Sequence, residues 1–272
     1  MKIHISATLM LPVLPDKYFL VRYRLTHLIA EGSWAKVYCV ETISEPRECY
    51  ALKIIRKQQR SKPERVRNEV ACHRALSDQP NVIALIAVCQ VDGDVYILQE
   101  LGELDLFEQM TRAYIRGMPE HVVKCVARDM IRALQSCHQK GIMHRDVKLE
   151  NIVGSLRNGY KLTDFGFATQ EKSAIDFVGS LDYISPEIVN LTRHDYRTDI
   201  WSLGVTIFAL SCGRHPFLCS LDCDTEEQIR QGCYLWPSRI SPQCQNFVAQ
   251  MLQVDVEKRA SLLQLSAHEW LN

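Results

Sequence analysis

The sequence lacks several features that would place a chain in a special class of protein. Among its 272 residues, no apolar run approaches the roughly 18 residues that a membrane-spanning helix needs. It has no internal repeat, no low-complexity tract and no long linker. The 32 Lys and Arg residues balance the 32 Asp and Glu residues, so charge gives no sign of a nucleic-acid partner or an acidic membrane. An ordinary globular protein of one or two domains remains.

The cysteines support neither a disulfide framework nor a zinc site. There are eleven of them, an odd number, and no two form a CxxC pair. We therefore expect reduced thiols in an intracellular setting, cytoplasmic or nuclear. Cys212, His215, Cys219 and Cys223 suggest zinc at first sight, but their spacing is looser than that of structural zinc sites. Ordinary buried or surface thiols are the alternative that we expect.

The start of the chain is predicted to be a leader. The stretch "MKIHISATLMLPVLP" is apolar, but it is short, contains Pro12 and Pro15, and lacks a clear small-residue cleavage site. We expect a leader over residues 1–17 and a folded domain over 18–272. No appended regulatory or membrane-targeting domain is expected, because the last predicted helix ends at Asn272.

What the sequence does contain is a change of periodicity about a third of the way along. Strand-like alternation is followed by helical spacing from about Leu106 onward. Strands are predicted over residues 21–30, 36–43, 49–55, 81–90 and 95–101, with Asp92-Gly93 as a hairpin turn. Helices are predicted over residues 63–77, 120–141 and 198–213, the second ending at Gly141 and the third buried all round. The fold class is therefore α+β, with a small β-rich part before a larger helical part.

Charged side chains gather between apolar flanks in the stretch "GIMHRDVKLENIVG". Asp146, Lys148 and Asn151 lie there, and Asp164 follows in "KLTDFGFA". Protein interiors exclude unpaired charges, so charged side chains between apolar flanks indicate a functional site. Carboxylate and amide oxygens suit magnesium, and a lysine suits a phosphate oxygen. Phosphoryl transfer depends mostly on positioning and on neutralising charge, which these residue types can supply.

The order and spacing of "HRDVKLEN", "DFG" and "SPE" resemble the protein kinase family. The resemblance extends from Tyr23 to Leu271. It implies a bilobal fold, with a β-rich N-lobe containing one main helix over about residues 18–101 and a mainly α-helical C-lobe over about 106–272. It also implies ATP and Mg²⁺ as cofactors and protein substrates as partners, with no role for nucleic acid or a membrane. A regulatory partner has no visible signature in the sequence.

Roles follow from the resemblance, residue by residue. Asp146 is implied to accept or orient the proton of the substrate hydroxyl, and Lys148 to touch the transferring phosphate. Asn151 and Asp164 are implied to hold the magnesium ions. Within the nucleotide site, Lys53 is implied to contact the α- and β-phosphates and to pair with Glu69, and the hinge follows Gln99. The residues expected to contact ATP are Ala30, Gly32, Val37, Ala51, Lys53, Glu69, Glu100, Gly102 and Val153.

Two places depart from the family pattern, the glycine-rich loop and position 73. In "AEGSWAKV", Ala30 and Ala35 replace the outer glycines of the glycine-rich loop. Glycine there permits unusual backbone angles and close approach to phosphate, so we expect weakened nucleotide binding rather than none. His73 stands where an aliphatic residue usually packs against Phe165. It is expected to pack as a tolerated neutral ring or to make that contact pH-sensitive.

The resemblance also bears on substrates. Lys148 and the stretch "GSLDYISPE" are similar to serine/threonine kinases, with Ser180 where a threonine commonly braces the substrate-docking loop. Glu150 and Asp105 stand where acidic residues select substrate arginines, although both fit equally well as solvated charges. The sequence shows a weaker similarity to the calcium/calmodulin-dependent and AMP-activated group. A pseudokinase scaffold, which binds partners without phosphotransfer, is the alternative to an active enzyme.

Three further contacts are implied. Arg145 commonly binds an activation-segment phosphate, and we hypothesise that Asp176 pairs with it instead; a solvated loop aspartate is the alternative. Asp199 is expected to hydrogen-bond the backbone of the catalytic loop. Glu187 is expected to form a buried ion pair with Arg259.

Overall fold

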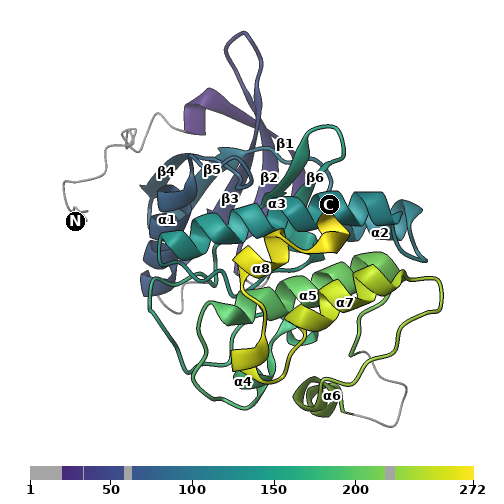
Figure 1. The fold of residues 1–272 in the computed structure, drawn as a ribbon. Helices are drawn as coiled ribbons and strands as arrows, with labels where there is room; N and C mark the ends of the chain where they lie inside the picture. Colours follow the sequence, from purple (N-terminus) through teal and green to yellow (C-terminus); the bar gives the residue numbers. More distant parts are fainter. Residues whose placement is uncertain (1–19, 33, 58–62, 218–223) are drawn as a thin grey trace. The chain divides into compact units, whose positions relative to one another are not determined.

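The structure is a computed structural model that describes residues 20–32, 34–57, 63–217 and 224–272 (Figure 1). The chain divides into two compact units. The first comprises residues up to Val66 together with Ile83–Leu101, and the second comprises Arg67–Val82 and Gly102–Asn272. The predicted leader over residues 1–17, as well as Cys219 and Cys223 of the zinc alternative, lies outside the described residues. The domain extents predicted above stay predictions.

The first unit is built on a five-stranded antiparallel sheet of order β1-β2-β3-β5-β4. The strands are β1 Tyr23–Glu31, β2 Lys36–Thr42, β3 Cys49–Ile55, β4 Leu85–Val91 and β5 Asp94–Glu100. The predicted turn at Asp92 and Gly93 joins β4 to β5, with φ angles of 51° and 93°. Two-residue hairpins need positive φ at both positions, so the local sequence chemistry explains this turn. A core cluster on the sheet comprises Val40, Leu52, Ile54, Ala87, Cys89, Tyr96 and Leu98.

The predicted strand boundaries differ from the observed ones by at most two residues, except at the start of β4. β4 begins at Leu85, not at residue 81. The Asn81 carbonyl instead accepts from the Leu162 amide at 2.9 Å, and Val82 forms a parallel bridge with Leu162. The apolar run over residues 81–90 is therefore divided: its first two residues pair with Leu162, and the residues from Leu85 onward form β4 beside β5. The periodicity of the run does not show where this division lies.

The second unit is mainly helical. Its helices are α2 Leu106–Ala113, α3 Glu120–Gln139, α4 Pro186–Val189, α5 Arg197–Cys212, α6 Thr225–Gln231, α7 Pro242–Met251 and α8 Leu262–Ser266. Short 3-10 helices are η3 Leu149–Asn151, η4 Leu181–Tyr183, η5 Val256–Lys258 and η6 Glu269–Leu271. A two-stranded ribbon, β6 Ile152–Ser155 and β7 Gly159–Leu162, joins them. The predicted α+β class, with strands first and helices later, is confirmed.

Helix α5 is the centre of the second unit's core, as its apolar composition predicts. Each of its residues from Thr198 to Cys212 is buried. A Cβ added at Gly204 would lie 2.8 Å from the Met251 Cβ atom, so glycine lets α7 approach α5 closely. The predicted helix α1 spans Pro63–Leu76, and its Cys72 and Leu76 belong to this same core. The core thus supports the loops that carry the charged residues.

No described helix is both long and apolar enough to span a membrane. The nine cysteines that the structure describes are all free thiols. None of the described residues forms a group of three or more His, Cys, Asp or Glu side chains that could hold a metal ion.

Candidate active site

The β6–β7 ribbon brings two of the predicted residues to one end. Ile152 and Leu162 are opposite each other in the antiparallel register, and both are fully buried. The ribbon continues by one more bond, because the Thr163 amide donates to the Asn151 carbonyl at 3.0 Å. Asn151, which precedes β6, and Asp164, which follows Thr163, therefore emerge from the same end of the ribbon.

Asp146 is buried, and three donors hold its carboxylate. Its exposed fraction is 3%. The Asn151 side-chain nitrogen donates to Oδ2 at 2.9 Å and to the Asp146 carbonyl at 2.8 Å. The Ser180 hydroxyl donates to Oδ1 at 2.9 Å, and Lys148 Nζ lies 3.1 Å from Oδ2. These contacts to both carboxylate oxygens fix the side chain of Asp146 in position.

Ser180 connects the activation segment to this carboxylate. Lys148 Nζ donates to the Ser180 hydroxyl oxygen at 2.8 Å. Because an ammonium group can only donate, the hydroxyl accepts a hydrogen bond from Lys148 and donates one to the Asp146 carboxylate. The three side chains form a closed polar ring, which would hold the segment after Asp164 against the catalytic loop.

His144 links the backbone of Asp146 to the backbone of Thr163. Its Nε2 donates to the Thr163 carbonyl at 3.1 Å, so Nδ1 is left to accept from the Asp146 amide at 3.3 Å. Its ring meets Phe165 edge-on at 5.0 Å between centroids. His73 stacks on Phe165 at 5.1 Å and is buried, so the histidine takes the packing position expected of it.

Asp199 hydrogen-bonds the backbone of the loop that contains His144, Arg145 and Asp146, as predicted. Its Oδ2 accepts from the His144 amide at 3.0 Å, and its Oδ1 accepts from the Arg145 amide at 2.7 Å. His138 Nε2 lies 2.9 Å from Oδ2. Burial by itself raises the pKa of Asp199, but the His138 hydrogen bond and the amide donors lower it overall. Sequence reasoning missed His138; its place in the last turn of α3 was the available signal.

Arg145 and Asp176 form a bidentate ion pair. Arg145 Nη1 donates to Asp176 Oδ1 at 2.9 Å and to Oδ2 at 3.2 Å. Arg145 Nε donates to the Phe167 carbonyl at 2.8 Å, which fixes the guanidinium. The Asp176 side chain is 49% exposed, so solvent screens the pair. The hypothesised contact is present; its regulatory role stays a prediction.

His194 lies beside this ion pair, and no motif in the sequence predicts that position. An isolated backbone bridge between Ala174 and His194 brings it there. His194 Nε2 is 3.5 Å from Asp176 Oδ1, and neither ring nitrogen has a hydrogen-bond partner among the described residues. Burial lowers the pKa of His194 from 6.5, and Arg145 lowers it further, while Asp176 and Glu187 oppose the shift.

This environment predicts acid sensitivity. The unfolded chain protonates His194 near pH 6.5, whereas the folded protein does so only at lower pH. The unfolded state therefore binds more protons below that pH. The unfolding free energy that neutral His194 contributes is fully present above about pH 6.5. It is lost as the pH falls from there through the lower pKa of the folded protein, by up to about 1.4 kcal/mol for each unit by which the two pKa values differ. We expect His194→Gln to flatten the fall in unfolding free energy between about pH 7.5 and 5.5, measured by urea denaturation.

The control for this prediction is His121→Gln, at an exposed position on α3. It should leave the pH dependence as in the wild-type protein. His215, whose pKa burial also lowers, remains in both variants and contributes equally to each. A His194→Gln variant with the wild-type pH slope would contradict the assignment.

The donor atoms at the end of the ribbon fit magnesium. Both hydrogen bonds of the Asn151 amide come from its nitrogen, so its oxygen is the atom left for a cation. Asp164 has a positive φ of 61°, and its Oδ1 accepts from the Gly166 amide at 3.0 Å. Magnesium takes only one or two protein oxygens beside phosphates and water, so two such residues are sufficient.

The first unit places most of the residues predicted to contact ATP on three adjacent strands. Val37 on β2 is opposite Ala30 of β1 and Lys53 of β3. Ala51 is two residues from Lys53 and therefore on the same face of the sheet. The Gly32 amide donates to the Ala35 carbonyl at 2.9 Å, which closes the loop between β1 and β2.

The remaining predicted contacts are distributed as follows. Glu100 ends β5, and its Oε2 accepts from the Ala84 amide at 3.2 Å. A Cβ added at Gly102 would lie 2.6 Å from Val153 Cγ2, so only glycine fits there. Glu69 is buried on α1. The expected pairing of Glu69 with Lys53 stays a prediction.

The two acids predicted to select basic substrates differ in their surroundings. Asp105 caps α2, where its Oδ1 accepts from the Glu108 amide at 2.7 Å. Burial raises the pKa of Asp105. Glu150 is exposed in η3, four residues after Asp146 and next to Asn151 in the chain. Because Asp105 already caps α2, its assignment to substrate binding is weakened. The exposed position of Glu150 is compatible with substrate binding.

Comparison with known proteins gives one family match and many relatives. The model of the protein kinase domain matches residues 23–271. A human protein, SNF-related serine/threonine-protein kinase, is 36% identical over 209 residues, which cover 75% of this chain and 27% of that protein. The mouse protein of the same name has the same identity, over 75% of this chain and 28% of its own length. Serine/threonine-protein kinase PLK4 of Drosophila persimilis is 31% identical over 259 residues, covering 92% of this chain and 33% of that protein. The chain thus spans about a third or less of the curated relatives it matches.

Proposed function

This chain belongs to the protein kinase family, and from that premise we propose that it is a serine/threonine protein kinase. It transfers the γ-phosphate of ATP to Ser and Thr hydroxyls of protein substrates. The observation that carries the proposal is the polar ring of Asp146, Lys148 and Ser180, with Asn151 beside it. The names of the relatives agree with this activity.

In the proposed reaction, Asp146 orients the acceptor hydroxyl and takes its proton. The Asn151, Ser180 and Lys148 donors hold its carboxylate, so no reorganisation is needed when the substrate arrives. Lys148, already 2.8 Å from the Ser180 hydroxyl, can place positive charge near the transferring phosphoryl group. Because phosphoryl transfer has a loose transition state, catalysis rests on this positioning and charge placement.

The family implies ATP and a divalent metal, and we propose Asn151 and Asp164 as the metal ligands. Magnesium, when bound, would neutralise charge on the phosphate oxygens. Lys53 would contact the α- and β-phosphates, with Glu69 as its partner. Ala30, Gly32, Val37, Ala51, Glu100, Gly102 and Val153 would contact the nucleotide. Ala30 and Ala35, in place of glycines, would weaken that binding without abolishing it.

The direct test is phosphate transfer from radiolabelled ATP, with magnesium, to peptides that differ only in Ser, Thr or Tyr as the acceptor. We expect labelled Ser and Thr peptides and no labelled Tyr peptide. Labelling must depend on Asp146, as argued in the Discussion. Absence of transfer to all three peptides, from protein that still binds ATP, would favour the pseudokinase alternative.

We further propose that Glu150 favours basic residues near the acceptor. An arrayed peptide library should show a preference for arginine, and Glu150→Gln should reduce that preference about tenfold, through loss of a charge-assisted contact. Asp105 is the second position proposed to favour basic residues. The variant Asp105→Asn tests it, because asparagine keeps an oxygen that can cap α2 while removing the negative charge. A wild-type preference for proline or acidic residues would contradict basic specificity altogether.

Asp176 is proposed to take the place of an activation-segment phosphate. Its pairing with Arg145 ties the segment to the catalytic loop, so Asp176→Ala should lower kcat about tenfold by releasing that tie. The matched control is Glu171→Ala, at an exposed acid of the same segment, and it should leave kcat unchanged. Unaltered activity in Asp176→Ala, or a strict requirement for phosphate on Ser173, would contradict the role.

A further inference from the structure

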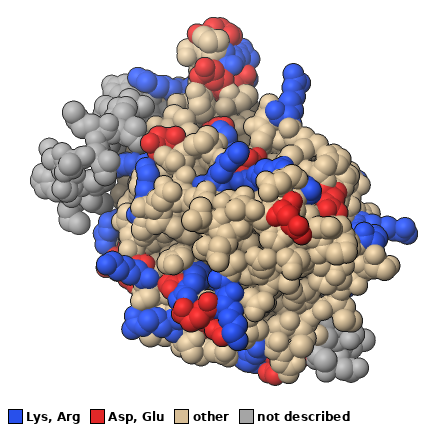
Figure 2. Space-filling view, in the orientation of Figure 1, with Lys and Arg blue, Asp and Glu red and all other residues tan. Residues whose placement is uncertain are grey.

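Basic side chains recur every four residues along one face of α3. Lys124, Arg128 and Arg132 occupy this face, and an α-helix rises about 6 Å over each four-residue step. Figure 2 shows Lys and Arg side chains gathered across the middle of the view, where α3 runs in Figure 1. Arg157 is exposed in the turn between β6 and β7, and its chain neighbour Leu156 lines a cavity together with Arg128 and Arg132. We call these four residues the α3 basic face.

Two cavities adjoin the α3 basic face. One, of about 210 Å³, is lined by Arg128 and Arg132 together with Leu156 and Tyr160. The other, of about 270 Å³, lies beside the same two arginines and includes Ile131. Leu156 is 52% exposed, so apolar surface is accessible beside the charges. A ligand for this surface would combine negative charge with an apolar side chain.

Carboxylates of the described chain offset little of this positive charge. Asp129 is the one acid that lines either cavity within the described residues. It lies 3.5 Å from Arg132, and its other oxygen already accepts from the Tyr160 amide at 3.0 Å. Glu120 precedes Lys124 by one helical turn, and its Oε1 already accepts from Trp270 Nε1 at 2.7 Å and from the Ser241 hydroxyl at 2.8 Å. Glu103 bonds to Ser155 and Asn158 in the β6–β7 turn.

Neutral groups, by contrast, hold two of the cations. Arg128 donates to the Leu271 carbonyl. Lys124 Nζ lies 5.8 Å from the centre of the Trp270 ring. Neither contact supplies a negative charge, and like charges four residues apart on a helix repel one another. A ligand with negative charges at matching intervals would remove that repulsion.

We propose that the α3 basic face docks an acidic peptide segment of a partner protein. In an extended peptide, alternate side chains lie about 6.7 Å apart on one face, close to the roughly 6 Å step between the cations on α3. Glutamates at alternate positions would meet Lys124, Arg128 and Arg132 in turn, and would accept charge-assisted hydrogen bonds from the Lys124 ammonium and the two guanidinium groups. An apolar side chain would enter the cavity beside Leu156. The surface uses no residue proposed for phosphate transfer, so the inference goes beyond that function.

The test is fluorescence anisotropy with a labelled peptide of about nine residues, which has glutamate at alternate positions and one central leucine. We expect saturable binding near 50 mM salt that weakens at 300 mM, because salt screens exposed charges. The double variant Arg132→Glu/Arg157→Glu should raise the Kd at least tenfold. It spares Arg128, whose bond to Leu271 supports the fold. Arg112→Glu/Lys258→Glu, with the same change of charge elsewhere on the second unit, should leave Kd within about twofold.

Several outcomes would overturn the proposal. One is the absence of saturable binding, and another is an unchanged Kd in Arg132→Glu/Arg157→Glu. Equal affinity for an oligothymidylate of the same charge would show a general attraction for polyanions. Equal affinity for the peptide with serine in place of leucine would remove the cavity from the binding site. Binding is measured without phosphate transfer, so failure of the kinase proposal would leave this test intact.

Discussion

Replacing Asp146 with asparagine is expected to lower kcat about 10²–10⁴-fold, with KM for ATP changed less than about twofold. Asparagine has nearly the same shape and keeps one oxygen, which can still accept from the donors now at Oδ2, Asn151 and Lys148, so the loop should hold its shape. It loses the carboxylate that takes the acceptor proton. A steady-state transfer assay with a Ser peptide, at saturating and limiting ATP, separates the two effects.

The control for Asp146→Asn is Asp78→Asn. It removes the same charge from an exposed position on the second unit, where the side chain is 74% accessible. Its kcat should equal that of the wild-type protein. Full activity in Asp146→Asn would contradict the central role, and loss of folding can be recognised from the near-ultraviolet circular dichroism of the buried tryptophans.

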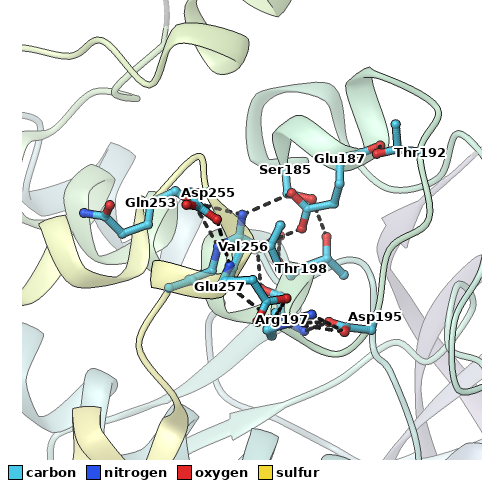
Figure 3. Close-up of polar contacts among 12 residues, drawn as sticks. Ser185, Glu187, Thr192, Asp195, Arg197, Thr198, Gln253, Asp255, Val256 and Glu257 are labelled. Carbon is cyan, nitrogen blue, oxygen red and sulfur yellow. Dashed lines mark hydrogen bonds and ion pairs between the residues drawn. The ribbon is translucent and has the colours of Figure 1, made fainter.

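The second large effect concerns the ion pair between Glu187 and Arg259. Figure 3 shows Glu187 among polar neighbours that include Arg197 and Gln253. Arg259 Nη1 donates to Glu187 Oε1 at 2.7 Å, and Nη2 donates to Oε2 at 3.0 Å. The side chains are 0% and 6% exposed for Arg259 and Glu187. Arg259 also donates to the carbonyls of Arg197 and Gln253, and its guanidinium lies 5.2 Å from the centre of the Trp201 ring.

Glu187→Ala is expected to lower the unfolding free energy by about 3–5 kcal/mol, because it leaves a buried guanidinium without its counter-charge. Urea denaturation followed by tryptophan fluorescence measures this, since Trp201 is fully buried and stacks on Phe217. Glu108→Ala breaks the exposed pair with Arg112 and should cost only about 0–1 kcal/mol.

A double variant tests the mechanism of this destabilisation. Glu187→Met/Arg259→Met removes both charges and fills the space with apolar atoms. Buried ion pairs often exchange for apolar residues at little cost, so the double variant should be more stable than Glu187→Ala. If it proves less stable, the hydrogen bonds of Arg259 to backbone carbonyls, and not the unpaired charge, would dominate.

Sequence reasoning succeeded where the chemistry is local. Strand alternation located the five strands, and Asp92-Gly93 specified its own hairpin because both residues tolerate positive φ. The motif around Asp146 predicted its partners because Lys148 and Asn151 are within five residues of it, so one loop conformation joins them. Even the longer-range pair of Glu187 with Arg259 followed from the family resemblance.

Sequence reasoning failed where two distant segments compete or meet. Residues 81–82 continue an apolar run, yet they bond to Leu162 and leave the sheet to begin at Leu85. His138 and His194 carry no motif, because each acquires its neighbour from a different segment. Asp105 matches a substrate-binding position in the pattern, but the start of α2 uses it as a cap.

By itself the sequence determined the α+β class, the family and the set of polar residues around Asp146, since these depend on short-range periodicity and on closely spaced motifs. Only the tertiary structure decided between the two alternatives for Asp176, in favour of its contact with Arg145. It also showed that His194 is buried beside them and that basic side chains of α3 border cavities. The reason is physical. Burial and the distance between side chains far apart in the chain arise when the core around α5 packs, and no local pattern encodes which charges that packing leaves uncompensated.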